Sequence, residues 1–122
     1  MRNMSFSMTT DEIRARTKIV TRRFGWSFLK PGDRVQAVEK AMGLKKGEKV
    51  KPLAVLEVVS LRSEPLKRMI DESSYGEAEV IREGFAELSP SGFVAMLCSH
   101  YGVTPAATVN RIEFRYMETM AP

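Results

Sequence analysis

The stretch PLAVLEVVSL, from Pro52 to Leu61, decides the fold. Its apolar side chains occupy both odd and even positions, so neither face of a strand built from it would be consistently polar. A run of this kind suits a strand that is covered on both faces, such as the central strand of a small barrel. We therefore expect Pro52–Leu61 to be the core strand of the domain.

The segments on either side predict short strands interrupted by helices. Further strands are predicted at residues 4–8, 18–24, 34–40 and 108–117, and helices at residues 10–17, 74–84 and 89–102. The resulting order, β-α-β-β-β-α-α-β, contains no internal repeat and favours an α+β barrel over a doubly wound sheet. A chain of 122 residues is long enough for one core and too short for two ordinary domains, so residues 1–122 are predicted to form a single domain.

Residues at the helix ends support this assignment. Ser89 followed by Pro90 is typical of a helix start, and Gly102 is typical of a helix end. Thr9 and Ser74 are each followed three residues later by a glutamate, which is the spacing of a capping box. All three helices are therefore expected to begin at a capping side chain.

The spacing of apolar residues predicts which faces are buried. In the second predicted helix the apolar stripe consists of Ala78, Ile81 and Phe85. In the third helix one face carries Phe93, Met96, Leu97 and Tyr101. The last strand alternates, with Ile112, Phe114 and Tyr116 on its inner side and Arg111, Glu113 and Arg115 on its outer side. That strand is therefore predicted to be half exposed.

Positive charge is concentrated in the first half of the chain. Residues 1–61 contain 13 Lys and Arg against 6 Asp and Glu, a net charge of +7, whereas residues 62–122 contain 6 against 9, a net charge of −3. A surplus of Lys and Arg attracts phosphate, so we expect an anionic partner to dock on the basic half. Residues 43–51 add four lysines in a segment that is expected to face solvent, where it contacts a partner or nothing.

Composition argues against several other classes of protein. One cysteine, Cys98, and one histidine, His100, cannot form an internal disulfide or a usual zinc site, so we expect no metal, no cofactor and a cytoplasmic location. Two residues apart on a helix, they face different sides, which disfavours a Cys/His hydrolase and leaves packing and surface roles. No run of about 18 apolar residues and no signal-like N-terminus are present, so no membrane partner is expected.

Five segments in order and spacing resemble the ASCH domain, a member of the PUA-like superfamily. They are SFSM at Ser5–Met8, RTKIVTRR at Arg16–Arg23, KPGDRVQAV at Lys30–Val38, the long apolar strand, and IREGF at Ile81–Phe85. The similarity extends from about Ser5 to Tyr116. It implies a small mixed PUA-like β-barrel with flanking helices that close one side of a cleft, and a ligand that is RNA, a nucleotide or a modified nucleoside.

The resemblance also implies candidate catalytic residues. Some small ASCH proteins are amidohydrolases that remove the acetyl group of N4-acetylcytidine with a Lys and a Thr at K-x-x-T spacing and a Glu further along. Lys18 and Thr21 stand at that spacing, and Glu83 matches the Glu best, with Glu79 and Glu87 as alternatives.

Each of these residues also has a structural interpretation. Lys18 and Thr21 would face opposite sides of a regular strand, so joint action requires Lys18 to lie at the helix-to-strand junction. There it would polarise an acyl oxygen as an ammonium or attack as a neutral amine, or simply be a solvated lysine at a helix end. Glu83 precedes the glycine that ends its helix, where the dipole disfavours a carboxylate; it is either functional or part of a solvated acidic face.

Arginine and aromatic residues after Lys18 are candidate ligand-binding groups. Parity places Arg23 with Thr21 and so in the cleft, where a guanidinium can hold phosphate or a base edge, although Arg22 and Arg23 could both extend to solvent. Trp26 is a candidate for stacking on a base, whereas Phe24 is expected in the core.

Three functions follow from these candidates. The first is an RNA- or nucleoside-binding domain with a basic cleft near Lys18, Thr21, Arg23 and Glu83. The second is an amidohydrolase acting on N4-acylcytidine, with Glu83 activating water, Lys18 stabilising the oxyanion and Thr21 positioning one of them. The third is a protein-interaction module. Convergence of the Lys18 amine and the Glu83 carboxylate in one pocket would favour chemistry, and a shallow groove of Arg and Lys would favour RNA.

Overall fold

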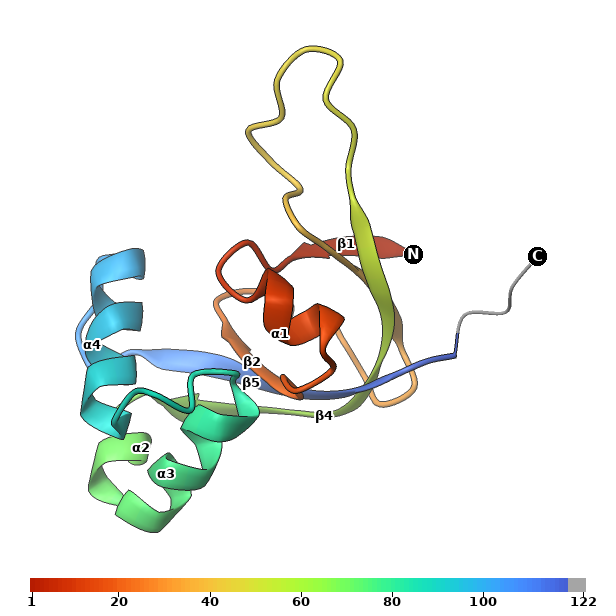
Figure 1. The fold of residues 1–122 in the computed structure, drawn as a ribbon. Coiled ribbons are helices and arrows are strands. Elements are labelled where there is room, and N and C mark those ends of the chain that lie inside the picture. Colours follow the sequence, from red (N-terminus) through yellow and green to blue (C-terminus); the bar gives the residue numbers. More distant parts are fainter. Residues whose placement is uncertain (119–122) are drawn as a thin grey trace.

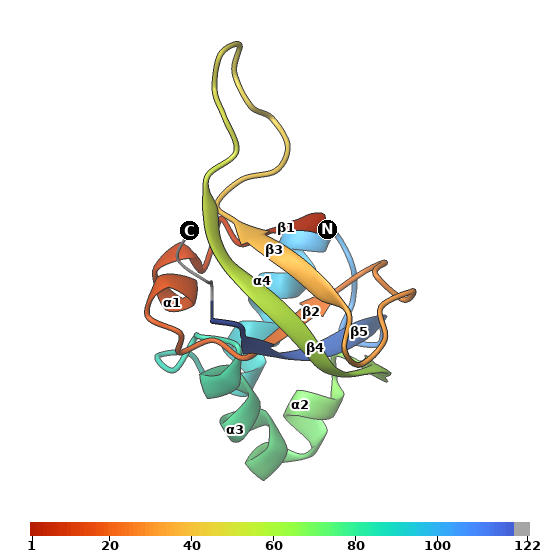
Figure 2. The same ribbon diagram turned by 90° about the vertical axis from the view of Figure 1, so that its right-hand side faces the viewer.

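A mixed five-stranded sheet is the frame of the protein, which is described here by a computed structural model covering residues 1–118. The 14-residue strand β4 (Pro52–Pro65) lies in the middle of the strand order β1-β3-β4-β5-β2. The other strands are β1 (Arg2–Ser5), β2 (Val20–Arg23), β3 (Arg34–Val38) and β5 (Thr108–Tyr116). Strand β1 pairs in parallel with β3, and the remaining pairs are antiparallel. The sheet curls into a half-barrel (Figure 2).

Four helices accompany the sheet: α1 (Thr10–Arg14), α2 (Arg68–Asp71), α3 (Ser73–Arg82) and α4 (Pro90–Tyr101). Helices α2, α3 and α4 group together on one side of the half-barrel, while α1 lies close to β4 (Figure 1). The small α+β barrel with flanking helices is therefore confirmed. The one addition to the predicted order is α2, whose four residues are too few to give a helical period. No helix within residues 1–118 combines the length and the apolar character that crossing a membrane requires.

Two apolar clusters hold these layers together. The concave side of the sheet encloses the first, which consists of Met4, Phe6, Ile13, Leu29, Val35, Ala37, Leu56, Val58, Ile112 and Phe114. The second lies between the helices and one end of the sheet and consists of Leu66, Met69, Val80, Phe93, Val94, Leu97 and Val109. Phe93 and Leu97 of α4 thus pack against Val109 of β5, as the apolar face of α4 predicts.

Strand β4 is central, but it is not covered on both faces as predicted. Leu56 and Val58 face the core, whereas Val59 is 43% exposed. The register with β5 shifts between Val58 and Ser60, which is a β-bulge. A bulge inserts one residue and reverses the facing of the positions beyond it, so Leu61 packs on the same core as Leu56 and Val58. The bulge explains why the core-facing apolar positions change from even to odd between Val58 and Leu61.

The helix ends agree with the sequence at α4 and differ at α1 and α3. The Ser89 hydroxyl accepts a hydrogen bond from the Gly92 amide at 3.0 Å, and Gly102 ends α4 in the left-handed conformation. The Thr9 side chain makes no capping bond, and α1 ends at Arg14, three residues earlier than predicted. Helix α3 begins after Glu72 without a side-chain cap, so the Ser74 prediction is wrong.

The predicted face of α3 is wrong, whereas on β5 Ile112 and Phe114 face the core as predicted and only Arg111 departs from its predicted side. On α3 the buried residues are Gly76, Glu79 and Val80, while Ile81 is 60% exposed. On β5 the predicted outward-facing Arg111 is buried. Glu79 and Arg111 form a buried ion pair with each other, which accounts for the burial of both charged side chains. Phe24 is likewise exposed, not in the core, and packs edge-on against Tyr101 with ring centroids 5.0 Å apart.

The bulge in β4 can be tested by a matched pair of substitutions. Leu56→Ala removes a fully buried side chain from the core, so it should lower the free energy of unfolding by roughly 2–5 kcal/mol. Val59→Ala changes an exposed position of the same strand and should cost less than about 1 kcal/mol. Urea denaturation followed by circular dichroism measures both. Equal losses would contradict the observed register.

Candidate functional site

A pocket of about 220 Å³ lies between the β1–α1 connection, β2 and α4. Its ionisable and hydroxyl side chains include Lys18, Thr21, Arg22, Arg23, Glu83 and His100. Its apolar and aromatic wall includes Phe6, Phe85, Phe93, Met96, Leu97 and Tyr101. The pocket therefore places aromatic rings around a small set of charged groups.

Lys18 and Glu83 converge in this pocket although they are 65 positions apart. The Lys18 Nζ donates to the Glu83 backbone oxygen at 2.6 Å and to Glu83 Oε1 at 2.8 Å, and both side chains are only 3% exposed. Lys18 lies in the connection between α1 and β2, the position that joint action with Thr21 requires. Convergence is the arrangement that favours chemistry over a shallow basic groove.

The backbone around Lys18 and Glu83 is fixed by several contacts. The Tyr116 hydroxyl donates to the Lys18 carbonyl at 2.6 Å, and the Ile19 amide donates to the Arg82 carbonyl at 2.8 Å. Gly84 follows with φ +88°, and a Cβ there would lie 3.1 Å from Glu12 and 3.4 Å from Lys18. Only glycine suits both the left-handed turn and the close approach, so Gly84 allows the end of α3 to meet the Lys18 segment.

Burial lowers the pKa of Lys18 below its ordinary value of 10.5, because the charged amine loses its hydration. The charge and hydrogen bond of Glu83 offset part of this decrease. A buried lysine with a lowered pKa carries a larger neutral fraction than a surface lysine, and the neutral form is the one that acts as a base or nucleophile.

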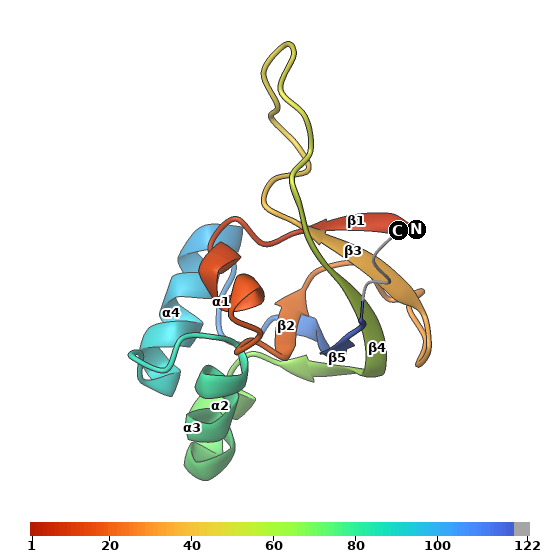
Figure 3. The same ribbon diagram turned by 45° about the vertical axis from the view of Figure 1, so that its right-hand side comes forward.

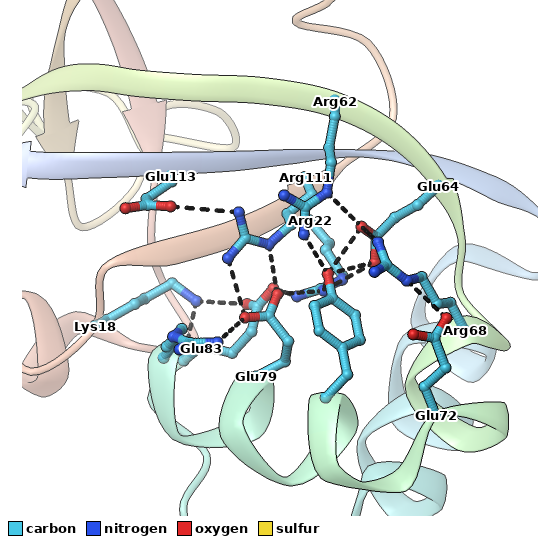
Figure 4. Close-up of polar contacts among 12 residues, drawn as sticks. Lys18, Arg22, Arg62, Glu64, Arg68, Glu72, Glu79, Glu83, Arg111 and Glu113 are labelled. Atoms are coloured by element: carbon cyan, nitrogen blue, oxygen red, sulfur yellow. Dashed lines mark hydrogen bonds and ion pairs between the residues drawn. The ribbon is translucent and has the colours of Figure 1, made fainter.

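Arg22 lies at the centre of three carboxylates, as Figure 4 shows. Its Nη1 donates to Glu83 Oε2 at 2.9 Å, and its Nη2 donates to Glu79 Oε1 at 2.5 Å and to Glu64 Oε2 at 3.1 Å. Burial acts to lower the pKa of Arg22, but Glu83 and Glu79 outweigh it and raise the pKa. Arg22 is therefore a permanently charged group whose Nη1 and Nη2 are engaged while its buried Nε has no partner among residues 1–118, and both oxygens of Glu83 accept hydrogen bonds from Lys18 and Arg22.

Glu79 anchors the same network from the other side. Its oxygens accept from Arg111, from Arg82 at 2.9 Å and from Arg22. Burial acts to raise the pKa of Glu79, but hydrogen bonding by Arg111 and the charge of Arg22 hold it well below its ordinary value. Beyond Arg22, Glu64 continues the network to Tyr75 and the more exposed Arg62 and Arg68 (Figure 4).

The network neutralises the charge that the first half of the chain brings to the pocket. Lys18 and Arg22 come from residues 1–61, whereas Glu64, Glu79 and Glu83 come from residues 62–122. The net charge of +7 on residues 1–61 therefore overestimates the positive charge that the pocket offers to a ligand.

Arg23 is the pocket cation that remains without a carboxylate partner among residues 1–118. Its Nε donates to Thr21 Oγ1 at 3.0 Å, and its Nη2 donates to the Ser5 carbonyl. The guanidinium lies over the Phe6 ring, 4.7 Å from its centroid. Burial lowers the pKa of Arg23 below its ordinary value, and the group stays charged at neutral pH.

The remaining candidates lie elsewhere or in unexpected positions. Trp26 is not among the pocket residues. It packs against the sheet core, and its ring centroid lies 5.7 Å from that of Phe28. Glu87 is exposed, and Glu79 is buried behind the pocket, so Glu83 is the glutamate that lines it. His100, predicted to be a surface or packing residue, lines the pocket, and Cys98 packs against the helical cluster.

The partners of Arg22 could not be found from the sequence. They lie 42 to 61 positions away, so no local spacing connects them. Within residues 1–118, no group of three His, Cys, Asp or Glu side chains is placed to hold a metal ion.

Comparison with solved structures identifies the fold. No family model matches the sequence, and no curated protein matches it. A DUF984 protein from Enterococcus faecalis V583, EF3133, superposes with a TM-score of 0.65 at 12% identity, over 96% of this chain and 76% of that one. The hypothetical protein PH0355 gives a TM-score of 0.61 at 16% identity, over 95% and 96%.

A third structure carries the family name. The ASCH domain from Lactobacillus crispatus JV V101 superposes with a TM-score of 0.57 at 14% identity, over 94% of this chain and 78% of that one. The chain therefore has the fold of an ASCH domain.

The buried network predicts a dependence of stability on pH. The pKa of Glu79 is lower in the folded than in the unfolded chain, so Glu79 stabilises the fold above about pH 4.5, and this stabilisation is lost as the pH falls below that value. Glu79→Gln should lower the free energy of unfolding at pH 7 by about 3–5 kcal/mol and flatten its dependence on pH in acid.

Glu77→Gln on the exposed face of α3 is the matched control and should leave the acid profile unchanged. Denaturant unfolding at pH values from 3 to 7 measures both variants, with those limits chosen to span roughly the ordinary carboxyl range. An acid profile of Glu79→Gln that parallels the wild type would contradict the assigned network.

Proposed function

We propose that the pocket binds a single nucleobase or nucleoside. Its size carries the proposal: about 220 Å³ is below the roughly 300–1,000 Å³ of pockets for drug-sized ligands, and suits one ring system with its sugar. Aromatic side chains such as Phe85 and Tyr101 provide faces for a planar base. The resemblance to ASCH domains implies the same ligand class.

Arg23 is the group that would recognise the base. Its Nε and Nη2 are held by Thr21 and Ser5, and its Nη1 makes no hydrogen bond to residues 1–118. A planar guanidinium fixed in this way presents a donor to a carbonyl or ring nitrogen of a base edge. Lys18 and Arg22 are less suited to this role because Glu83 engages both.

A second candidate function, hydrolysis of an N4-acylcytidine, is favoured by the convergence of Lys18 and Glu83. The Lys18 Nζ donates to two oxygens of Glu83. A neutral amine has two hydrogens, so both would be satisfied there and the lone pair would remain available to the pocket. In the ammonium form, a third N–H would remain instead. In either state Lys18 has one position free for substrate or water.

The environment of Glu83 favours Lys18 as the base. Both carboxylate oxygens of Glu83 are engaged, Oε1 by Lys18 and Oε2 by Arg22, so neither is directed at a water in the pocket. In the proposed step the neutral Lys18 amine takes a proton from water, and the resulting hydroxide attacks the acyl carbon. The C–N bond then breaks, and Lys18 returns the proton to the leaving amine. The products are a carboxylic acid and cytidine.

Thr21 would stabilise the oxygen that becomes negative during this step. Its Oγ1 already accepts a hydrogen bond from Arg23, so its own hydrogen is free to donate to the acyl oxygen. Arg23 beside it adds positive charge. Thr21 therefore acts as a donor in this proposal, and Glu83 holds Lys18 in place.

The test is turnover of N4-acetylcytidine, followed as formation of cytidine. Lys18→Ala and Glu83→Gln should each lower kcat/KM about a hundredfold or more, and the double variant should be no worse than either, because the two residues act as one unit. The rate should rise with pH until Lys18 is neutral, at a pKa below 10.5. Lys30→Ala, at an exposed position, is the control and should keep full activity.

Calorimetric titration with cytidine separates the two candidates. If cytidine binds and Arg23→Ala abolishes binding while no N4-acylcytidine is hydrolysed, the pocket is a binding site and the hydrolase proposal is overturned. If neither cytidine nor N4-acetylcytidine binds, both proposals fail, and the protein-interaction module is the remaining function.

A further inference from the structure

The loop between β3 and β4 carries most of the net charge of the protein. Residues 39–51 contain five lysines and two glutamates, a net charge of +3, whereas the whole chain has +4. The other 109 residues therefore contribute only +1. The basic character expected of the pocket is located in this loop.

The loop projects away from the sheet as a long arm (Figures 1 and 3). At its base the Glu39 amide donates to the Lys51 carbonyl at 3.1 Å. At its tip the Lys45 amide donates to Glu48 Oε1 at 2.8 Å and the Glu48 amide donates to the Lys45 carbonyl at 2.9 Å, around Gly47 with φ +82°. These bonds close the arm at both ends, so its lysines are held outside the core.

Most of these lysines have no acidic partner. Lys40 pairs with Glu48 at 3.6 Å, whereas the exposed Lys45, Lys46, Lys49 and Lys51 make no ion pair with residues 1–118. The hollow within the loop is about 30 Å³, room for no more than about one or two waters. The arm therefore offers point charges and no pocket, which suits a repeating anion read without regard to sequence.

The base of the arm adjoins the pocket. The Ser5 hydroxyl donates to the Glu39 carbonyl at 3.3 Å, and the Phe6 amide donates to the Val38 carbonyl at 2.8 Å. Ser5 and Phe6 both line the pocket. A strand with one base in the pocket would therefore find the arm next to its neighbouring phosphates.

We propose that the Glu39–Lys51 loop is a phosphate-binding arm for single-stranded nucleic acid whose base enters the pocket. The placement of the base rests on the proposed function, and the charge of the arm does not. A membrane surface is the poorer partner, because binding to a membrane requires apolar side chains that insert into it. Within residues 39–51, Met42 is the one large apolar side chain that is strongly exposed, at 84%.

Two double variants with equal net charge test this proposal. Lys46→Gln/Lys49→Gln removes two charges from the arm, and Lys30→Gln/Lys67→Gln removes two from exposed positions elsewhere. Binding of a labelled single-stranded RNA oligonucleotide is measured by fluorescence anisotropy from low to moderate salt. The arm variant should reduce the log-log salt slope by about 1.4, since each lost phosphate contact on a single strand contributes about 0.7, and the control should keep the wild-type slope.

Equal slopes for the two variants would overturn the proposal, because only net charge would then matter. Loss of binding to phosphatidylserine vesicles with unchanged RNA binding in the arm variant would overturn it in favour of a membrane.

Free cytidine separates this proposal from the proposed function: the arm variant should bind cytidine as the wild type does. RNA binding that depends on the arm in a protein with no cytidine affinity would support the arm and refute the pocket proposal. Unfolding curves confirm that both variants fold.

Discussion

The structure depends on the placement of one buried guanidinium, that of Arg22, among Glu64, Glu79 and Glu83. Arg22 is on β2, Glu64 is at the end of β4, and the other two glutamates belong to α3 and its C-terminus. Removing charges from water is costly, and only close pairing with good geometry offsets the cost. The helical layer therefore has one favourable position on the sheet, the position in which all three carboxylates reach Arg22.

This arrangement determines the chemistry of the pocket. With Arg22 holding Glu83 from behind, the other Glu83 oxygen is directed at Lys18, and a lysine that would otherwise extend into solvent is kept in the pocket wall. Lys18 and Arg22 are both paired with Glu83. Arg23 and the Thr21 hydroxyl are therefore the polar groups available to a ligand. The basic residues of the first half of the chain therefore lie in two different settings: Lys18 and Arg22 are paired with carboxylates at the pocket, and most lysines of the β3–β4 loop are exposed and unpaired among residues 1–118.

Local signals in the sequence predicted the fold well. The caps of α4, Ser89 and Gly102, depend only on neighbouring residues, and the order of strands and longer helices along the chain followed from apolar patterns. The K-x-x-T spacing and Glu83 pointed to groups that the structure places together. What could not be predicted is non-local: the bulge in β4 that brings Leu61 to the core, and the pairs of Arg22, whose members are 42 to 61 positions apart. Periodicity assigns a charged residue to solvent, and so it misplaced the buried Glu79 and Arg111.

The central claim is that Lys18 is buried and held by Glu83, and a titration of Lys18 tests it directly. Carbon-13 NMR of the lysine Cε resonance, assigned with Lys18→Arg, gives the pKa in the wild type and in Glu83→Gln. Burial should place the wild-type pKa below 10.5, and loss of the Glu83 charge should lower it further. A Lys18 that titrates at its ordinary value in both proteins would contradict the account, because the amine would then be in solvent and unpaired.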